Sequence, residues 1–139
     1  MPTSSTLIPC LSYRDAPRMI DWLCSTFGFK RHLVVEDGQG GIVHAQLTFG
    51  GGMIMLGSER SGDDPFGRLQ KTPAVLGGTT QSPYVVVTDA DDIHARVKAA
   101  GGEIVIAIKN ADHGGRDFSC LDPEGHLWHI GTYDPWKAD

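Results

Sequence analysis

Six histidines are the side chains of this 139-residue chain best suited to acid–base or metal chemistry. His129 lies in an apolar, strand-like segment and is the leading candidate for a ligand contact or a catalytic base, the alternative being a hydrogen-bonded strand histidine. His44 shares the polar face of another strand-like segment with Gln46 and Thr48, and that face points into a cleft or into water. His113, in a Gly-rich loop, is a further candidate for a ligand contact.

Other catalytic signatures are absent from the sequence. Neither a GxSxG motif nor a GxxxxGK[ST] motif occurs, and the Gly50-Gly51-Gly52 run precedes a strand-like segment instead of a helix. Arg116 either meets an anionic ligand or forms a salt bridge with Asp117 or Asp122, and the salt bridge is the favoured alternative.

The composition is that of an ordinary globular protein, with 40% hydrophobic and 21% charged residues. A formal net charge of −5 argues against nucleic acid as a partner, and no apolar run reaches the roughly 18–20 residues that span a bilayer. Cys10, Cys24 and Cys120 are odd in number and lack CxxC spacing, so we expect free thiols and a cytoplasmic location.

The elements that position these residues occur twice. Asp15-Ala16 and Asp89-Ala90 each follow an apolar run and open a helical pattern, 74 residues apart. The same offset aligns further turn glycines and apolar residues without a gap: Gly28 with Gly102, Leu47 with Leu121, Gly51 with Gly125, Ile54 with Trp128, Leu56 with Ile130 and Gly57 with Gly131.

Each half therefore predicts one strand, one helix and three further strands. In the first half the strands are expected at residues 6–13, 30–35, 42–49 and 53–56, with a helix at 17–27 that Asp15 caps. In the second half they are expected at 83–88, 103–108, 116–121 and 126–132, with a helix at 91–100. We expect one domain of residues 1–139, with module one at about 6–58, a linker at about 59–81 and module two at about 82–133.

The linker, residues 58–82, is polar and rich in Gly and Pro, which predicts a long surface loop. Phe66 and Leu69 are apolar groups within it, so we expect a mobile loop that closes over a site.

The duplicated βαβββ pattern resembles the vicinal oxygen chelate superfamily, which includes glyoxalase I, extradiol dioxygenases and bleomycin-resistance proteins. The resemblance spans about residues 6–133, and its most specific piece is Asp122-Pro123-Glu124-Gly125-His126-Leu127-Trp128. It implies an α+β fold in which two tandem βαβββ modules form a curved eight-stranded mixed sheet around a cleft. The Gly114-Gly115-Arg116 segment looks like an uncharacterised bacterial branch.

Metal-dependent members of that superfamily place ligands on the first and last strand of each module. Carried over, those positions are Ile8, Met55, Ser82 and His129, which form two pairs at the 74-residue offset. Only His129 is a strong donor, and a divalent ion needs three or more. We therefore predict no metal site and no cofactor.

The same face describes a pocket for a small molecule. Strand alternation predicts a lining that is mostly apolar and sulfur-containing, as in many pockets for aromatic or heterocyclic ligands. The residues expected to contact the ligand are Ile8, Cys10, His44, Met53, Met55, Ser82, Tyr84 and His129. Plain core filling is the alternative for Met53 and Met55.

Two functions follow from these features. The first is a metal-independent binding protein that sequesters an aromatic or heterocyclic molecule. The second is an enzyme, either a lyase or dioxygenase with non-standard ligands such as His44 and His129, or a cofactor-free isomerase with His129 as its base. Open sheet edges favour a homodimer, and Tyr133 and Trp136 are either interface anchors or clamps on the chain's own surface.

Overall fold

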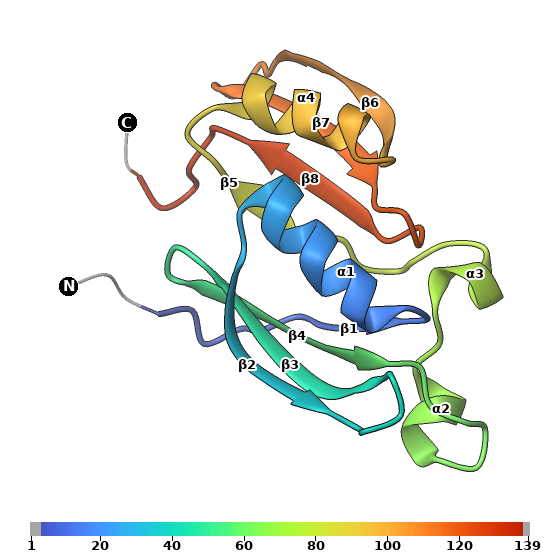
Figure 1. The fold of residues 1–139 in the computed structure, drawn as a ribbon. Helices are drawn as coiled ribbons and strands as arrows, with labels where there is room; N and C mark the ends of the chain where they lie inside the picture. Colours follow the sequence, from blue (N-terminus) through green and yellow to red (C-terminus); the bar gives the residue numbers. More distant parts are fainter. Residues whose placement is uncertain (1–3, 138–139) are drawn as a thin grey trace. The chain divides into compact units, whose positions relative to one another are not determined.

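A computed structural model describes residues 4–137 of the chain (Figure 1). The chain divides into two compact units, Met1–Leu76 and Gly77–Asp139, and each has one four-stranded mixed sheet with a helix packed on it. The predicted α+β class and the two βαβββ modules are confirmed. The described strands form two four-stranded sheets, however, and not the single eight-stranded sheet that we expected. No helix among residues 4–137 is long and apolar enough to cross a membrane.

The first unit contains four strands, one long helical segment and two short helices. In chain order these are β1 (Cys10–Tyr13), α1 (Ala16–Trp22), the π-helix η1 (Leu23–Phe27), β2 (Lys30–Glu36), β3 (Ile42–Phe49), β4 (Gly52–Ser58), α2 (Pro65–Leu69) and α3 (Pro73–Leu76). The strand order is β1-β4-β3-β2, with β1 parallel to β4 and the other pairs antiparallel.

The second unit repeats the βαβββ plan of the first. Its elements are β5 (Tyr84–Val86), α4 (Ala90–Ala99), β6 (Glu103–Asn110), β7 (Arg116–Leu121) and β8 (Leu127–Gly131). The strand order is β5-β8-β7-β6, and again only the first pair is parallel.

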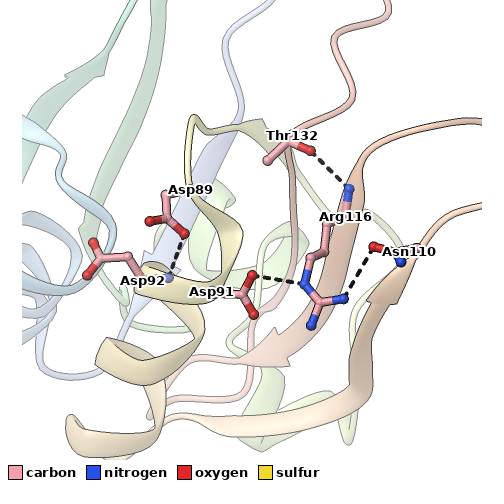
Figure 2. Close-up of polar contacts among 6 residues, drawn as sticks. All are labelled: Asp89, Asp91, Asp92, Asn110, Arg116 and Thr132. Carbon is pink, nitrogen blue, oxygen red and sulfur yellow. Dashed lines mark hydrogen bonds and ion pairs between the residues drawn. The ribbon is translucent and has the colours of Figure 1, made fainter.

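Side-chain caps start both long helices, and the cap by Asp15 confirms the prediction for the first of them. Asp15 accepts a hydrogen bond from the backbone N–H of Arg18 at 3.3 Å, and Asp89 accepts one from the N–H of Asp92 at 3.1 Å (Figure 2). Apolar residues at helical spacing then face the sheet: Met19, Ile20, Leu23 and Phe27 in the first unit, Ile93 and Val97 in the second.

The predicted linker is not a bare loop, because residues 65–69 and 73–76 form α2 and α3 (green in Figure 1). Asp64 caps α2 by accepting the N–H of Phe66 at 2.8 Å, and Pro65 occupies the first helical turn. A methyl group at Gly67 would lie only 1.9 Å from the carbonyl oxygen of Ser61, so α2 packs against its own entry loop. The predicted mobility of this segment stays a prediction.

The repeat is confirmed, but its alignment has two gaps that the sequence did not reveal. The first and last strands of each unit match at the 74-residue offset, since Cys10↔Met55 in β1/β4 corresponds to Tyr84↔His129 in β5/β8. The second and third strands match at 73 instead, since Lys30↔Thr48 in β2/β3 corresponds to Glu103↔Leu121 in β6/β7.

Two single-residue differences explain this change of offset. The π-helix η1 lengthens the first unit's helical segment, and the left-handed Gly28 (φ 96°) accordingly matches Gly101 (φ 86°) and not Gly102. The turn between β7 and β8 is one residue longer than its counterpart and restores the offset of 74. A one-residue slip exchanges the two faces of a strand, so the gaps decide which side chains of β7 share a face with His129.

Candidate functional site

The sheet of the second unit carries an open hollow of about 560 Å³. Four of its lining residues lie on one face of three adjacent strands: Tyr84 on β5, His129 on β8, and Asp117 and Ser119 on β7. The alternate residues Val85, Cys120, Trp128 and Ile130 are buried, as the period of two in a strand requires. The hollow therefore has ligand dimensions and a polar floor.

Two serine hydroxyls hold the ring of His129. Ser119 Oγ lies 2.7 Å from Nδ1, and Ser82 Oγ lies 2.7 Å from Nε2. In a neutral imidazole one nitrogen donates and the other accepts, and a hydroxyl can satisfy either role. Strand pairing brings these groups together, because Ser119 is the register partner of His129 and Ser82 lies two residues before β5.

Tyr84 forms the wall beside His129. Its hydroxyl donates to the backbone carbonyl of Tyr133 at 2.8 Å, and its ring lies over Gly131. A methyl group at Gly131 would lie 2.5 Å from the Tyr84 hydroxyl oxygen and 3.0 Å from Asp117 Cβ, so a glycine is needed there. Burial raises the pKa of the Tyr84 phenol, and the Asp117 carboxylate adds to this shift.

Aromatic rings and charges make up the rim. The ring of His113 meets the ring of Tyr133 edge to face, with centroids 4.8 Å apart. Lys109 and Asp112 also line the hollow. His113, a candidate from the sequence, therefore lines the hollow.

Arg116 is neutralised within the second unit (Figure 2). Its Nε donates to Asp91 Oδ2 at 2.8 Å and its Nη1 to Asn110 Oδ1 at 3.3 Å. Thr132 Oγ1 accepts its backbone N–H at 2.9 Å. The predicted partners Asp117 and Asp122 were wrong, because the guanidinium points across the sheet edge to the first turn of α4.

The Asp122-to-Trp128 motif has a structural role. Asp122 is buried, and its carboxylate accepts the Trp128 indole N–H at 3.1 Å and the backbone N–H groups of Glu124 and His126 at 2.9 and 3.1 Å. The most specific residues of the sequence pattern thus fix the β7–β8 turn and do not line the hollow.

The first unit carries a smaller hollow of about 210 Å³, lined in part by Cys10, His44 and Met55. Met55 lies between its register partners Cys10 on β1 and Gln46 on β3, and the Gln46 amide nitrogen lies 3.1 Å from His44 Nε2. The segment after β4 covers one side, where Gln70 donates to the Cys10 carbonyl at 3.0 Å.

The predicted site residues thus fall into two groups. In the first unit Cys10, His44 and Met55 line the smaller hollow, whereas Ile8 and Met53 are half-buried outside it. In the second unit Tyr84 and His129 line the larger hollow, and Ser82 reaches it through its hydrogen bond to His129.

Lys109, Asp117 and Ser119 are among the residues of the larger hollow that were not predicted as ligand contacts. Asp117 and Ser119 alternate with buried Phe118 and Cys120. That alternation indicates a strand with one polar face. The sequence alignment at 74 residues did not match this face to His44 and Gln46, because β3 and β7 correspond at an offset of 73.

The donor set does not fit the metal that related folds use. Ile8 offers no donor atom, Met55 offers a weak thioether, and the two good atoms of His129 face serine hydroxyls. Among residues 4–137, no three His, Cys, Asp or Glu side chains are grouped so as to hold a metal ion.

Comparison with known proteins adds family relationships. The sequence profile of the Glyoxalase/Bleomycin resistance protein/Dioxygenase superfamily matches residues 7–130. Uncharacterized protein Mb0911c of Mycobacterium bovis is 32% identical over 125 residues, which cover 90% of this chain and 81% of that protein.

Two solved structures share the fold. TioX from Micromonospora sp. ML1 is 33% identical, with a TM-score of 0.71 over 94% of this chain and all of that one (100%). The fosfomycin resistance protein FosX from Listeria monocytogenes is 18% identical, with a TM-score of 0.66 over 95% of each chain, and shows a likeness of fold alone.

Proposed function

Because this chain belongs to the glyoxalase/bleomycin resistance protein/dioxygenase superfamily, we propose that it is a metal-independent binding protein for an aromatic or heterocyclic small molecule. The larger hollow, on the second unit, is the proposed main binding surface. Ile8, Cys10, His44, Met53 and Met55 of the first unit remain proposed ligand contacts.

The arrangement around His129 carries the proposal. With Ser82 and Ser119 at 2.7 Å from its two ring nitrogens, the imidazole is held in one orientation by neutral partners. Such a ring presents a flat, polarizable surface and rearranges little when a ligand arrives, which lowers the entropic cost of binding. Neither nitrogen is left for a metal unless a serine moves away.

The rest of the hollow supports an aromatic ligand. A volume of about 560 Å³ accommodates a molecule of one to three rings. The rings of Tyr84, His113 and Tyr133 offer stacking and edge-to-face contacts with such a molecule.

The experiment is a ligand titration on one variant. A thermal-shift screen of aromatic metabolites and antibiotics first identifies a ligand, since a molecule that binds only the folded state raises stability. His129→Ala should then weaken binding by roughly 0.5–1.5 kcal/mol and leave the fold intact, because the ligand loses the imidazole surface on which its ring packs.

His32→Ala is the matched control, because His32 is exposed on β2 and away from both hollows. It should leave affinity unchanged. Equal affinity of wild type and His129→Ala would remove His129 from the site, and His44 would become the next candidate.

A second candidate function is a cofactor-free enzyme with His129 as general base. The hydroxyl–imidazole–hydroxyl chain from Ser82 to Ser119 favours it, because such a chain can pass a proton from a substrate at the hollow. In that case His129→Ala abolishes turnover while affinity barely changes. A product assay on the same variant separates the two functions.

The proposal includes a cytoplasmic homodimer. Trp136 is 94% exposed and is the better candidate for an interface anchor, whereas Tyr133 is half-buried against His113 and Tyr84. Sedimentation of a monomer at tens of micromolar would contradict the dimer. Cys10, Cys24 and Cys120 are free thiols, which is compatible with a reducing compartment.

A further inference from the structure

The larger hollow contains two opposite charges that face each other across neighbouring strands. Lys109 on β6 is the register partner of Asp117 on β7, and both line the hollow. A β-bulge produces this pairing: Ile106 pairs with Ser119 and Lys109 with Asp117, so β6 has one residue more than β7 over this stretch. Bulges commonly redirect a side chain beside a binding site.

The other unit has no such charge pair. The residue of β2 that faces His44 is Val35, and the bulge beyond this pair lies on β3 instead of β2. The irregularity nearer the start of β2, between Arg31 and Leu33, has its counterpart in β6 between Ile104 and Ile106. The second bulge of β6 is therefore peculiar to the unit with the larger hollow.

Neither charge is neutralised by a neighbour. In the part of the chain that the structure describes, Lys109 and Asp117 form no salt bridge with each other or with any other side chain. The neighbouring Arg116 forms hydrogen bonds with Asp91 and Asn110 instead of with Asp117 (Figure 2).

Asp117 lies beside the aromatic wall. Its Cβ and the Tyr84 hydroxyl both lie within 3.0 Å of the point where a side chain at Gly131 would begin. Asp117 is half-buried, whereas Lys109 is exposed. A ligand stacked on Tyr84 would therefore remove water from Asp117 first and from Lys109 next.

Covering two charges with an apolar molecule is costly. A desolvated charge needs a partner of opposite sign and hydrogen bonds that replace its water. A purely apolar ligand supplies neither. A ligand with an acid and an amine supplies both, one for each side chain.

We propose that the ligand of this hollow is an amphoteric aromatic molecule, whose carboxylate binds Lys109 and whose protonated amine binds Asp117 beside the Tyr84 ring. This inference rests on the proposed function, because it assumes that an aromatic ligand occupies the same hollow.

Four indoles of similar size test the charge requirement: tryptophan, indole-3-propionate, tryptamine and 3-methylindole. They carry both charges, the acid alone, the amine alone and no charge. Calorimetric titration at pH 7 should give tryptophan the lowest Kd, about ten-fold or more below each of the others, because charge-assisted hydrogen bonds are roughly twice as strong as neutral ones.

Two variants assign the charges. Lys109→Met should raise the Kd of tryptophan and indole-3-propionate about ten-fold and leave tryptamine and 3-methylindole unchanged. Asp117→Asn should raise the Kd of tryptophan and tryptamine and spare the other two. Lys98→Met on α4 and Asp63→Asn in the first unit are matched controls, since both residues are exposed outside the larger hollow.

The outcomes separate this inference from the proposed function. Equal affinity for the four indoles, or affinities that neither variant changes, would overturn the charge assignment and leave an aromatic site intact. Tightest binding of indole-3-propionate, with no change of any Kd in Asp117→Asn, would also overturn the charge assignment. Binding of none of the four would contradict both the aromatic hollow and the inference.

Discussion

The two units place different chemistry on equivalent positions of the same scaffold. Cys10 and Met55 pair across the first two strands of one sheet, and Tyr84 and His129 pair at the same place in the other. The Cys10–Met55 pair consists of two sulfur-containing side chains, whereas the Tyr84–His129 pair consists of two rings that carry hydrogen-bonding atoms. A repeated backbone therefore does not imply a repeated site.

The next strand extends the contrast. Gln46 and His44 of β3 correspond to Ser119 and Asp117 of β7. In the first unit the amide and imidazole pair with each other at 3.1 Å. In the second unit Ser119 bonds to His129, and the Asp117 carboxylate forms no salt bridge within the described residues. One unit thus satisfies this pair of polar side chains internally, whereas the other leaves a carboxylate without an ion-pair partner.

The largest expected effect comes from a core residue that differs in size between the units. Trp128 is fully buried and donates to Asp122, and its equivalent is Ile54. Trp128→Ala should lower the free energy of unfolding by about 3–5 kcal/mol, because it leaves a cavity and removes a partner of a buried carboxylate.

Urea unfolding followed by circular dichroism measures this loss. Ile54→Ala is the matched variant and should cost less, because it removes a smaller side chain and breaks no hydrogen bond. A larger loss for Ile54→Ala would mean that the first unit, and not the second, limits the stability of the chain.

A second difference concerns pH, because Cys120 occupies the position of Leu47, which cannot ionise. Burial raises the pKa of the Cys120 thiol from 9.0 to about 12, with the Asp122 carboxylate contributing. Well below pH 9 the thiol is protonated in both the folded and the unfolded chain, so it adds no pH dependence to the free energy of unfolding. As the pH rises above 9 the unfolded chain loses its proton first, so stability falls by about 1.4 kcal/mol at pH 10.

Cys120→Ala should remove this part of the alkaline loss. The quantity to compare is the change in unfolding free energy between pH 8 and pH 10, measured for wild type, Cys120→Ala and the exposed-residue control Cys10→Ala. If Cys120→Ala loses as much stability as wild type over this interval, the thiol is not shielded as described.

The smallest expected effect concerns surface ion pairs. Arg116 pairs with Asp91 in the second unit, and Arg31 pairs with Asp21 in the first. All four side chains are substantially exposed, so each pair should contribute only about 0.5 kcal/mol. A double-mutant cycle with Arg116→Met and Asp91→Asn tests this, and a coupling free energy above about 2 kcal/mol would indicate a far less solvated network.

Much of the fold could be predicted from the sequence, because local signals specify it. Asp15 caps the first helix as predicted, and the ranges of β3 and β7 match residue for residue. The 74-residue offset also relates the β1/β4 pair to the β5/β8 pair.

The rest depends on packing between elements. The π-helix η1 and the longer β7–β8 turn each add one residue, and no composition signal marks either. Because each added residue exchanges the two faces of the strands that follow, Asp117 and Ser119 were not assigned to the face of His129. The bulge that places Lys109 opposite Asp117 forms only when β6 and β7 pair. For the same reason the tertiary contact of Arg116 with Asp91 was missed.

The central claim is that a small aromatic molecule binds without a metal, and one titration tests it most directly. The protein, prepared without a His-tag and stripped with EDTA, is titrated with its best aromatic ligand before and after addition of one equivalent of Zn²⁺, Ni²⁺ or Fe²⁺. The account predicts the same Kd in all conditions, because Ile8, Met55 and Ser82 offer no strong donors to accompany His129. Binding that disappears on stripping and returns with a stoichiometric metal would contradict it.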